Sequence, residues 1–146
     1  MPENVVKVKL QGDCLPAKEG TMIVLKEFEF DAAHYLPSYN GKCERLHGHT
    51  YKLVVKVDGV PDMEGMVLDF SLLKKIVQTK VLRKLDHRLL NDVIPNPSAE
   101  NIAIWVWDQL AKPLYAENRR LFEVEVWETR TSGCIYRGEF YEGELC

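Results

Sequence analysis

The sequence predicts an α+β domain in which an antiparallel four-stranded sheet carries two helices on one face. Three observations support this prediction. Four segments alternate between apolar and polar residues, as half-buried strands do, and two segments between the second and third strands carry apolar residues at helical spacing. The connections are short, so the order strand–strand–helix–helix–strand–strand is typical of an antiparallel sheet with helices packed on one side.

The first two predicted strands carry histidines on apolar rows. The first strand covers residues 22–34, and its apolar residues occupy alternate positions that end at His34. The loop that follows is marked by Pro, Ser, Asn and Gly. The second strand covers residues 47–57, where apolar residues continue the parity of His47 and His49. Because residues two apart share a face of a strand, these two imidazoles point the same way.

Two helices are predicted between the second and third strands. Asp69 is a suitable N-cap for the first helix, while Pro97 and Ser98 open the second, which ends near Pro113. The residues expected on the buried face of the first helix are Leu72, Leu73, Ile76, Val77 and Val81. Those expected on the buried face of the second helix are Ile102, Trp105, Val106 and Leu110.

The last two strands are predicted over residues 121–130 and 133–140. Alternation in the first of them places Phe122, Val124 and Val126 on one face and acidic residues on the other. The apolar face is therefore expected to pack on the helices.

Length and composition indicate one domain of ordinary make-up. The chain has 146 residues, of which 46% are hydrophobic and 28% are charged. Residues 1–21, which are interrupted by Gly and Pro, are expected to be an N-terminal extension, and residues 22–146 a single domain.

Charge and cysteine usage exclude several classes of function. The net charge is −3 and no run of Lys or Arg is present, which argues against a nucleic-acid partner. The longest apolar run, residues 102–107, is too short to span a membrane. The four cysteines form no C-x-x-C pair and the N-terminus lacks an apolar secretory segment, so we expect reduced thiols and a cytoplasmic protein.

The three histidines on apolar rows predict a zinc site. His47 and His49 lie about 6.5–7 Å apart along a strand, which suits two ligands converging on one ion. With His34 from the neighbouring strand they make three protein ligands and leave a fourth position for water or substrate. The alternatives remain that the H-x-H pair binds no metal and that His34 is a polar strand end.

Three further groups are candidates for the chemistry. Cys43 lies four residues before His47, and a nearby cation favours its thiolate; otherwise it is a small loop residue. Asp86 can orient the imidazole of His87, or the two can form a solvated helix end. Glu128 falls on the apolar row of its strand, where a carboxylate needs a partner. That partner is either a planar donor pair of a heterocycle or an internal cation such as Arg130.

Five motifs occur in order along the chain. They are Phe30-Asp31-Ala32-Ala33-His34, Cys43-x-x-x-His47-Gly48-His49, Leu85-Asp86-His87, Pro97-Ser98-Ala99-Glu100-Asn101 and Trp127-Glu128-Thr129. Over about residues 22–140 the chain thereby resembles the 6-pyruvoyltetrahydropterin synthase / 6-carboxytetrahydropterin synthase family. The resemblance implies the tunnelling fold, in which trimers close their sheets into a barrel and two trimers commonly stack into a hexamer. It also implies active sites at the interfaces of a homo-oligomer.

The resemblance implies a role for each candidate residue. The zinc ligands would be His34, His47 and His49. The residues that move protons would be Cys43, Asp86 and His87. The residues that hold the pterin ring would be Glu128, Ser98, Ala99 and Thr129. Lys52 would meet the triphosphate of the substrate, although it lies on the opposite parity from the histidines.

The substrate implied is 7,8-dihydroneopterin triphosphate. The three-residue gap between Cys43 and His47 is similar to the 6-carboxytetrahydropterin synthases of queuosine (7-deazaguanine) biosynthesis, which release acetaldehyde and triphosphate; family members that form the 6-pyruvoyl product usually have a longer gap. Glu44 stands where a folate-linked branch carries a catalytic glutamate, so the chain also resembles members that form 6-hydroxymethyl-7,8-dihydropterin. Glu44 can equally be a solvated loop charge. A non-catalytic zinc site with Cys43 as fourth ligand is a third reading.

Overall fold

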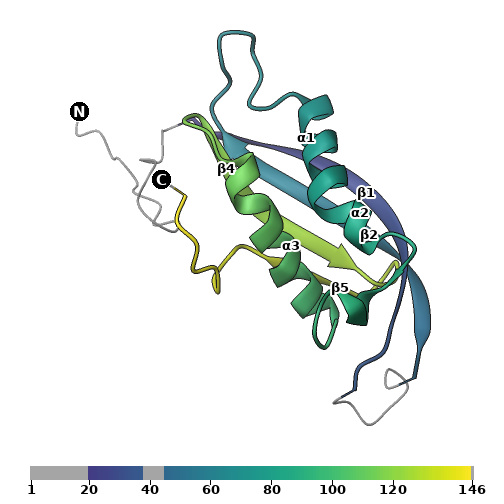
Figure 1. Ribbon diagram of the computed structural model, residues 1–146. Coiled ribbons are helices and arrows are strands. Elements are labelled where there is room, and N and C mark those ends of the chain that lie inside the picture. The colour runs from purple at the N-terminus through teal and green to yellow at the C-terminus, as the bar shows by residue number, and fades with distance from the viewer. Residues whose placement is uncertain (1–19, 38–44, 146) are drawn as a thin grey trace.

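The computed structural model describes residues 20–37 and 45–145, and it confirms the predicted α+β architecture with one additional strand. The strands are β1 (Met22–His34), β2 (His47–Gly59), β3 (Arg88–Leu89), β4 (Arg119–Trp127) and β5 (Gly133–Tyr136). They form one sheet in the order β3-β1-β2-β4-β5, of which Figure 1 labels β1, β2, β4 and β5. Only the two-residue β3 runs parallel to its neighbour. A strand of two residues is too short to show alternation, which is why the sequence pattern does not predict it.

The pairing of β1 with β2 positions the predicted metal ligands. The two strands pair along their whole length, from Met22 opposite Gly59 to His34 opposite His47. His49 lies opposite Ala32 in the same register. The three histidines therefore lie together at one end of the longest strand pair in the sheet.

The first predicted helix begins at its expected cap and runs further than its apolar stripe suggested. Helix α1 (Phe70–Val77) continues through a π-helical segment (Gln78–Leu82) into α2 (Arg83–Leu85). The Oδ1 atom of Asp69 accepts a hydrogen bond of 2.7 Å from the amide of Ser71. The fully buried residues along this helical run are Leu73, Val77, Val81 and Leu85. Leu72, predicted to be buried, is 40% exposed, because it lies about 100° around the helix from Leu73.

Helix α3 (Ala99–Leu114) has Ser98 as its N-cap, as predicted. Its buried stripe includes Ile102, Val106 and Leu110. Trp105, predicted to be on that stripe, is only half-buried, whereas the ring of Trp107 is buried and packs edge-on against Tyr136 at 5.6 Å between centroids.

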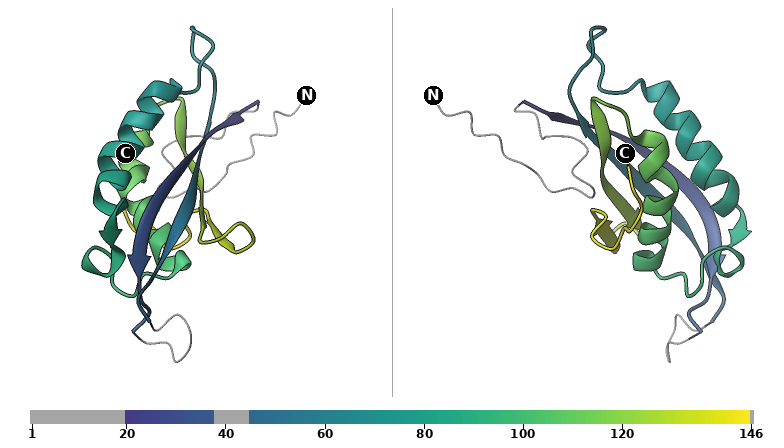
Figure 2. Two further views of the ribbon diagram at one scale, coloured as in Figure 1. Left: turned by 90° about the vertical axis from the view of Figure 1, so that its right-hand side faces the viewer. Right: turned by 60° about the vertical axis from the view of Figure 1, so that its left-hand side comes forward.

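The helices form a layer over one face of the sheet, and the core fills the space between the two layers (Figure 2). At the start of β4, the residue that faces the core differs from the one predicted. Lys56 pairs with Glu123 but the next residue, Val57, pairs with Leu121, so Phe122 is the extra residue of a β-bulge. Leu121 consequently takes the core position that alternation assigned to Phe122.

Some predictions concern parts of the chain that the structure does not describe. They are the proposed extension up to residue 19, Cys43 and Glu44. Within residues 20–37 and 45–145, no helix has the length and apolar character needed to cross a membrane.

Candidate active site

Three imidazoles converge where β1 and β2 end. The ligand nitrogens of His34, His47 and His49 all lie within 4.8 Å of one another. The Nε2 atoms of His34 and His47 are 3.0 Å apart. The side chain of His34 is 1% exposed, and those of His47 and His49 are half-buried. The three imidazoles are therefore partly enclosed by the protein.

Backbone carbonyls fix the orientation of two of these rings. The Nδ1 atom of His34 lies 2.7 Å from the carbonyl oxygen of Pro97, and Nδ1 of His47 lies 2.7 Å from that of Arg45. A carbonyl oxygen only accepts hydrogen bonds, so each Nδ1 carries the proton and donates it. The two Nε2 atoms are then both lone-pair acceptors at 3.0 Å. That arrangement is repulsive between neutral rings and is favourable around a shared cation.

The third imidazole completes a set that fits zinc. The Nε2 atom of His49 is buried and has no hydrogen-bond partner among the described residues. Burial lowers the pKa of His49, and the neighbouring His34 and His47 lower it further, although the Glu128 charge opposes them. Neutral imidazole is the form that binds metal. Nitrogens bound at 2.0–2.1 Å to one tetrahedral ion lie about 3.3 Å apart. This is close to the 3.0 Å between the Nε2 atoms of His34 and His47.

Glu128 and Tyr51 border the three imidazoles. An oxygen of Glu128 lies 4.0 Å from Nε2 of His34, and the side chain of Glu128 is 25% exposed. The sequence also allowed an ion pair between Glu128 and Arg130. Among the described residues, Glu128 has the contact with His34 and no ion pair with Arg130. The ring of Tyr51 packs edge-on against His49 at 5.3 Å, and its buried hydroxyl has no partner within the part of the chain described. Burial raises the pKa of Tyr51, and the Glu128 charge adds to this.

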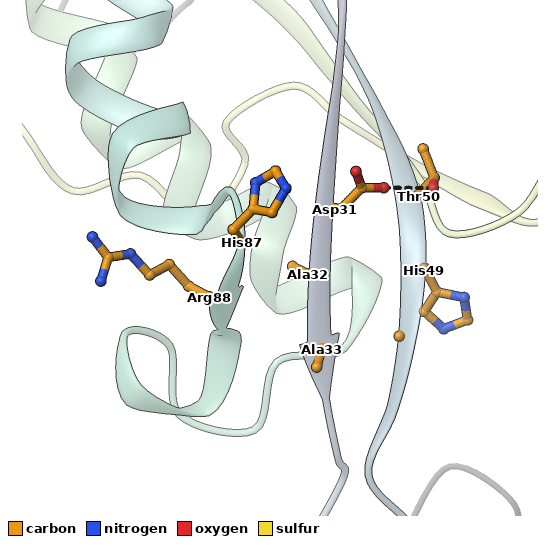
Figure 3. Close-up of a pocket in the computed structure, with 8 residues that line it drawn as sticks. Asp31, Ala32, Ala33, His49, Thr50, His87 and Arg88 are labelled. Atoms are coloured by element: carbon orange, nitrogen blue, oxygen red, sulfur yellow. Dashed lines mark hydrogen bonds between the residues drawn. The ribbon is translucent and has the colours of Figure 1, made fainter.

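Asp86 and His87 interact with each other but lie apart from the three imidazoles. The Nδ1 atom of His87 is 3.0 Å from Oδ1 of Asp86. Both residues belong to a second cluster with Asp31. In Figure 3, His87 lies on one side of the β1–β2 pair and the ring of His49 on the other. Within one chain, the predicted proton-transfer pair and the predicted metal ligands therefore form two separate clusters, although His49 and His87 line one open pocket.

Three of the remaining predicted residues lie at the ends of α3 and β4. Ser98 caps α3, with its hydroxyl accepting from the amide of Asn101 at 3.2 Å, and Ala99 is the first residue of that helix. They adjoin Pro97, whose carbonyl holds His34. Thr129 is exposed just beyond the end of β4.

Lys52 lies away from this group. Its ammonium is placed over the ring of Trp127, 5.4 Å from the centroid, on the strand parity opposite to the histidines. Cys43 and Glu44 are outside the described residues. Sequence reasoning missed Tyr51 and Pro97; the only available signals were that Tyr51 continues the row of His47 and His49 and that Pro97 opens one of the five motifs.

Comparisons with known proteins agree on one family. The family model described as 6-pyruvoyl tetrahydropterin synthase matches residues 23–139. A protein of Synechocystis sp. named 6-carboxy-5,6,7,8-tetrahydropterin synthase is 42% identical over 121 residues, which cover 78% of this chain and 92% of the relative. A protein of Pyrococcus furiosus named dihydroneopterin monophosphate aldolase is 39% identical over 110 residues, covering 75% of this chain and 92% of the relative. The solved structure of Caenorhabditis elegans 6-pyruvoyl tetrahydropterin synthase superposes with a TM-score of 0.71 at 29% identity, over 82% of this chain and 96% of that one.

Proposed function

This chain belongs to the 6-pyruvoyl tetrahydropterin synthase family, and on that premise we propose that it is a zinc-dependent 6-carboxy-5,6,7,8-tetrahydropterin synthase. It would convert 7,8-dihydroneopterin triphosphate and water to 6-carboxytetrahydropterin, acetaldehyde and triphosphate. The observation that carries the proposal is the trio of imidazoles with an unpartnered, buried Nε2 atom on His49. The name of the Synechocystis relative supports the choice of product.

The proposed zinc ligands are His34, His47 and His49. A bound zinc ion would act as a Lewis acid toward the hydroxyl groups of the substrate side chain. The protein would contribute preset ligands, because the carbonyls of Pro97 and Arg45 already hold two of the rings with Nε2 directed inward.

Glu128 is proposed to anchor the pterin ring. Its carboxylate is partly exposed and lies beside His34, so a bound heterocycle could reach both the carboxylate and the ion. A carboxylate can accept two parallel N–H bonds from the amino-pyrimidine edge of a pterin. Ser98, Ala99 and Thr129 are proposed to support the same ring, and Lys52 to meet the triphosphate.

Two groups are proposed to move protons. Cys43, in the segment between β1 and β2, would remove a proton from the substrate as a thiolate. His87, oriented by Asp86, would exchange a proton on the other side. Because this pair is separated from the three imidazoles within one chain, we propose that it serves the site of a neighbouring copy in a homo-oligomer, a trimer or a hexamer. The oligomer would act in the cytoplasm.

Product analysis tests the proposal directly. The purified protein, loaded with zinc, is incubated with 7,8-dihydroneopterin triphosphate, and the products are identified by mass spectrometry. The expected products are 6-carboxytetrahydropterin and acetaldehyde in equal amounts. A 6-pyruvoyl product, or intact substrate with full zinc occupancy, would contradict the proposal.

A second candidate is cleavage to 6-hydroxymethyl-7,8-dihydropterin, alone or beside the first activity. It is supported by Glu44 in the sequence and by the aldolase name of the Pyrococcus furiosus relative. The same product analysis detects it. If Glu44 is the base of this reaction, Glu44→Gln lowers the hydroxymethyl product selectively and leaves the carboxy product unchanged.

A further inference from the structure

Asp31 lines a pocket that is also lined by His87. The pocket has a volume of about 580 Å³, and its polar lining residues are Asp31, His49, Thr50, His87 and Arg88 (Figure 3). Asp31 is three residues before His34 on the same strand.

The backbone of Asp31 holds both members of this pair. The amide of His87 donates a hydrogen bond of 2.6 Å to the carbonyl oxygen of Asp31, and the amide of Asp31 donates one of 3.0 Å to Oδ1 of Asp86. His87 has a φ of 58°, in the left-handed region that residues other than glycine seldom adopt. Such a conformation persists where surrounding contacts fix it, and the bond from the His87 amide to Asp31 is one such contact.

The side chain of Asp31 is itself held in place. The hydroxyl of Thr50, directly across on β2, donates a hydrogen bond of 2.6 Å to Oδ1 of Asp31. A carboxylate oxygen of Asp31 lies within 4.8 Å of a carboxylate oxygen of Asp86 and of a ring nitrogen of His87. Two carboxylates this close repel each other, and an imidazole that carries a proton beside them offsets that repulsion.

We propose that Asp31 is a positioning residue, whose carboxylate, fixed by Thr50, holds the imidazole of His87 in the orientation needed for proton exchange. Asp86 contacts the ring on one side, and Asp31 supplies the second negative charge. The other ionisable residues that line this pocket are Arg88 and His49. The inference rests on the proposed function in that His87 exchanges a proton with the substrate.

Three variants separate the parts of this arrangement. Asp31→Asn removes the charge but keeps an oxygen that can accept from Thr50. Thr50→Val removes the donor and keeps a side chain of the same shape. Glu27→Gln removes a charge from an exposed residue of β1 outside the pocket and is the matched control.

The kinetic result should separate turnover from binding. With Asp31→Asn we expect kcat to fall at least about tenfold and KM to change less than about threefold, as for loss of proton-transfer efficiency. Thr50→Val should act in the same direction with a smaller effect, and Glu27→Gln should match the wild type. Zinc content and melting temperature are measured for each variant. Wild-type kcat in Asp31→Asn, or a loss that only follows lost zinc or lost fold, overturns the inference.

A spectroscopic measurement keeps this test apart from that of the proposed function. The imidazole nitrogen shifts of His87 are recorded by NMR and assigned with His87→Ala. Asp31→Asn should move these signals, whereas Glu27→Gln should not. If the wild type forms no pterin product, the proposed function fails and the NMR result alone decides whether Asp31 positions His87; unchanged His87 signals in Asp31→Asn would then overturn the inference.

Discussion

At the scale of single residues, the site depends on which nitrogen of each imidazole already makes a hydrogen bond to the protein. The carbonyls of Pro97 and Arg45 occupy Nδ1 of His34 and His47, so only the Nε2 atoms remain for a ligand. His49 has its Nε2 buried without a partner in the described structure. An orphaned buried acceptor costs about 1–3 kcal/mol. Binding of an ion at this point would remove that cost and the repulsion between the other two lone pairs.

Replacing Cys43 tests whether its sulfur reacts or coordinates. If Cys43 is the base, Cys43→Ala retains one zinc per chain and loses turnover by at least about a hundredfold, the usual contribution of a general base. Zinc is measured by elemental analysis and turnover by product formation. Cys134→Ala, a half-buried cysteine on β5, is the control and should change neither. Loss of zinc from Cys43→Ala would instead indicate a closed, four-ligand structural site.

At the scale of elements, local signals predicted four of the five strands and both helix caps, and non-local pairing determined β3 and the bulge in β4. The alternation over residues 22–34 and the caps Asp69 and Ser98 depend on neighbouring residues, and the structure has them as predicted. The bulge at Phe122 depends on the register of β4 against β2, which no pattern within β4 reveals.

The candidate site likewise has features that local sequence predicts and features that depend on residues far apart in the chain. His47 and His49 are two residues apart, and their shared direction could be predicted from strand geometry alone. The hydrogen bond from His34 to Pro97 joins residues 63 positions apart, and it depends on where α3 begins against the sheet. The separation of His87 from the histidine trio likewise depends on how β3 pairs with β1.

The cap at the start of α1 should contribute measurably to stability. Asp69→Ala removes the acceptor for the amide of Ser71 and a negative charge at the helix N-terminus, so the free energy of unfolding should fall by about 1 kcal/mol. Urea denaturation of the zinc-free and zinc-loaded protein measures the change. Asp69→Asn, which keeps a capping oxygen, should restore most of it. Equal losses in the two variants would show that the charge, and not the cap, is what matters.

At the scale of the whole molecule, the face of the sheet opposite the helices is joined by an ionic network. Lys56 on β2 contacts Glu123 at 2.6 Å and Glu125 at 2.9 Å, both on β4. Arg137, which follows β5, donates to Glu123 at 2.9 Å. Glu123 is only 3% exposed, so its charge depends on these partners. The network thereby links three strands that are otherwise joined by backbone pairing and by the core on the other face.

Stability should depend on pH through Glu123. Burial opposes its charged form, but hydrogen bonds from Lys56 and Arg137 outweigh this and hold the pKa of the carboxyl below its ordinary value of 4.5. The contribution is therefore complete above pH 4.5 and is lost as the pH falls through the lower pKa of the folded state. Urea denaturation between pH 7 and pH 3 should show a shallower loss of stability in Glu123→Gln than in the wild type. Glu117→Gln, at an exposed residue, should follow the wild type, and parallel curves for all three proteins would contradict the assignment.

The separation of His87 from the histidine trio makes a prediction about the assembly. If each site combines Cys43 of one chain with His87 of the next, Cys43→Ala and His87→Ala are each inactive alone but complement each other in a mixed oligomer. In a ring of three that contains both variants, one interface joins an intact Cys43 to an intact His87, so about one third of the sites should be active. Co-expression with two affinity tags and purification through both isolates the mixed assemblies, and product formation per chain gives the active fraction. A mixed assembly as inactive as either parent would contradict a site shared between neighbouring chains.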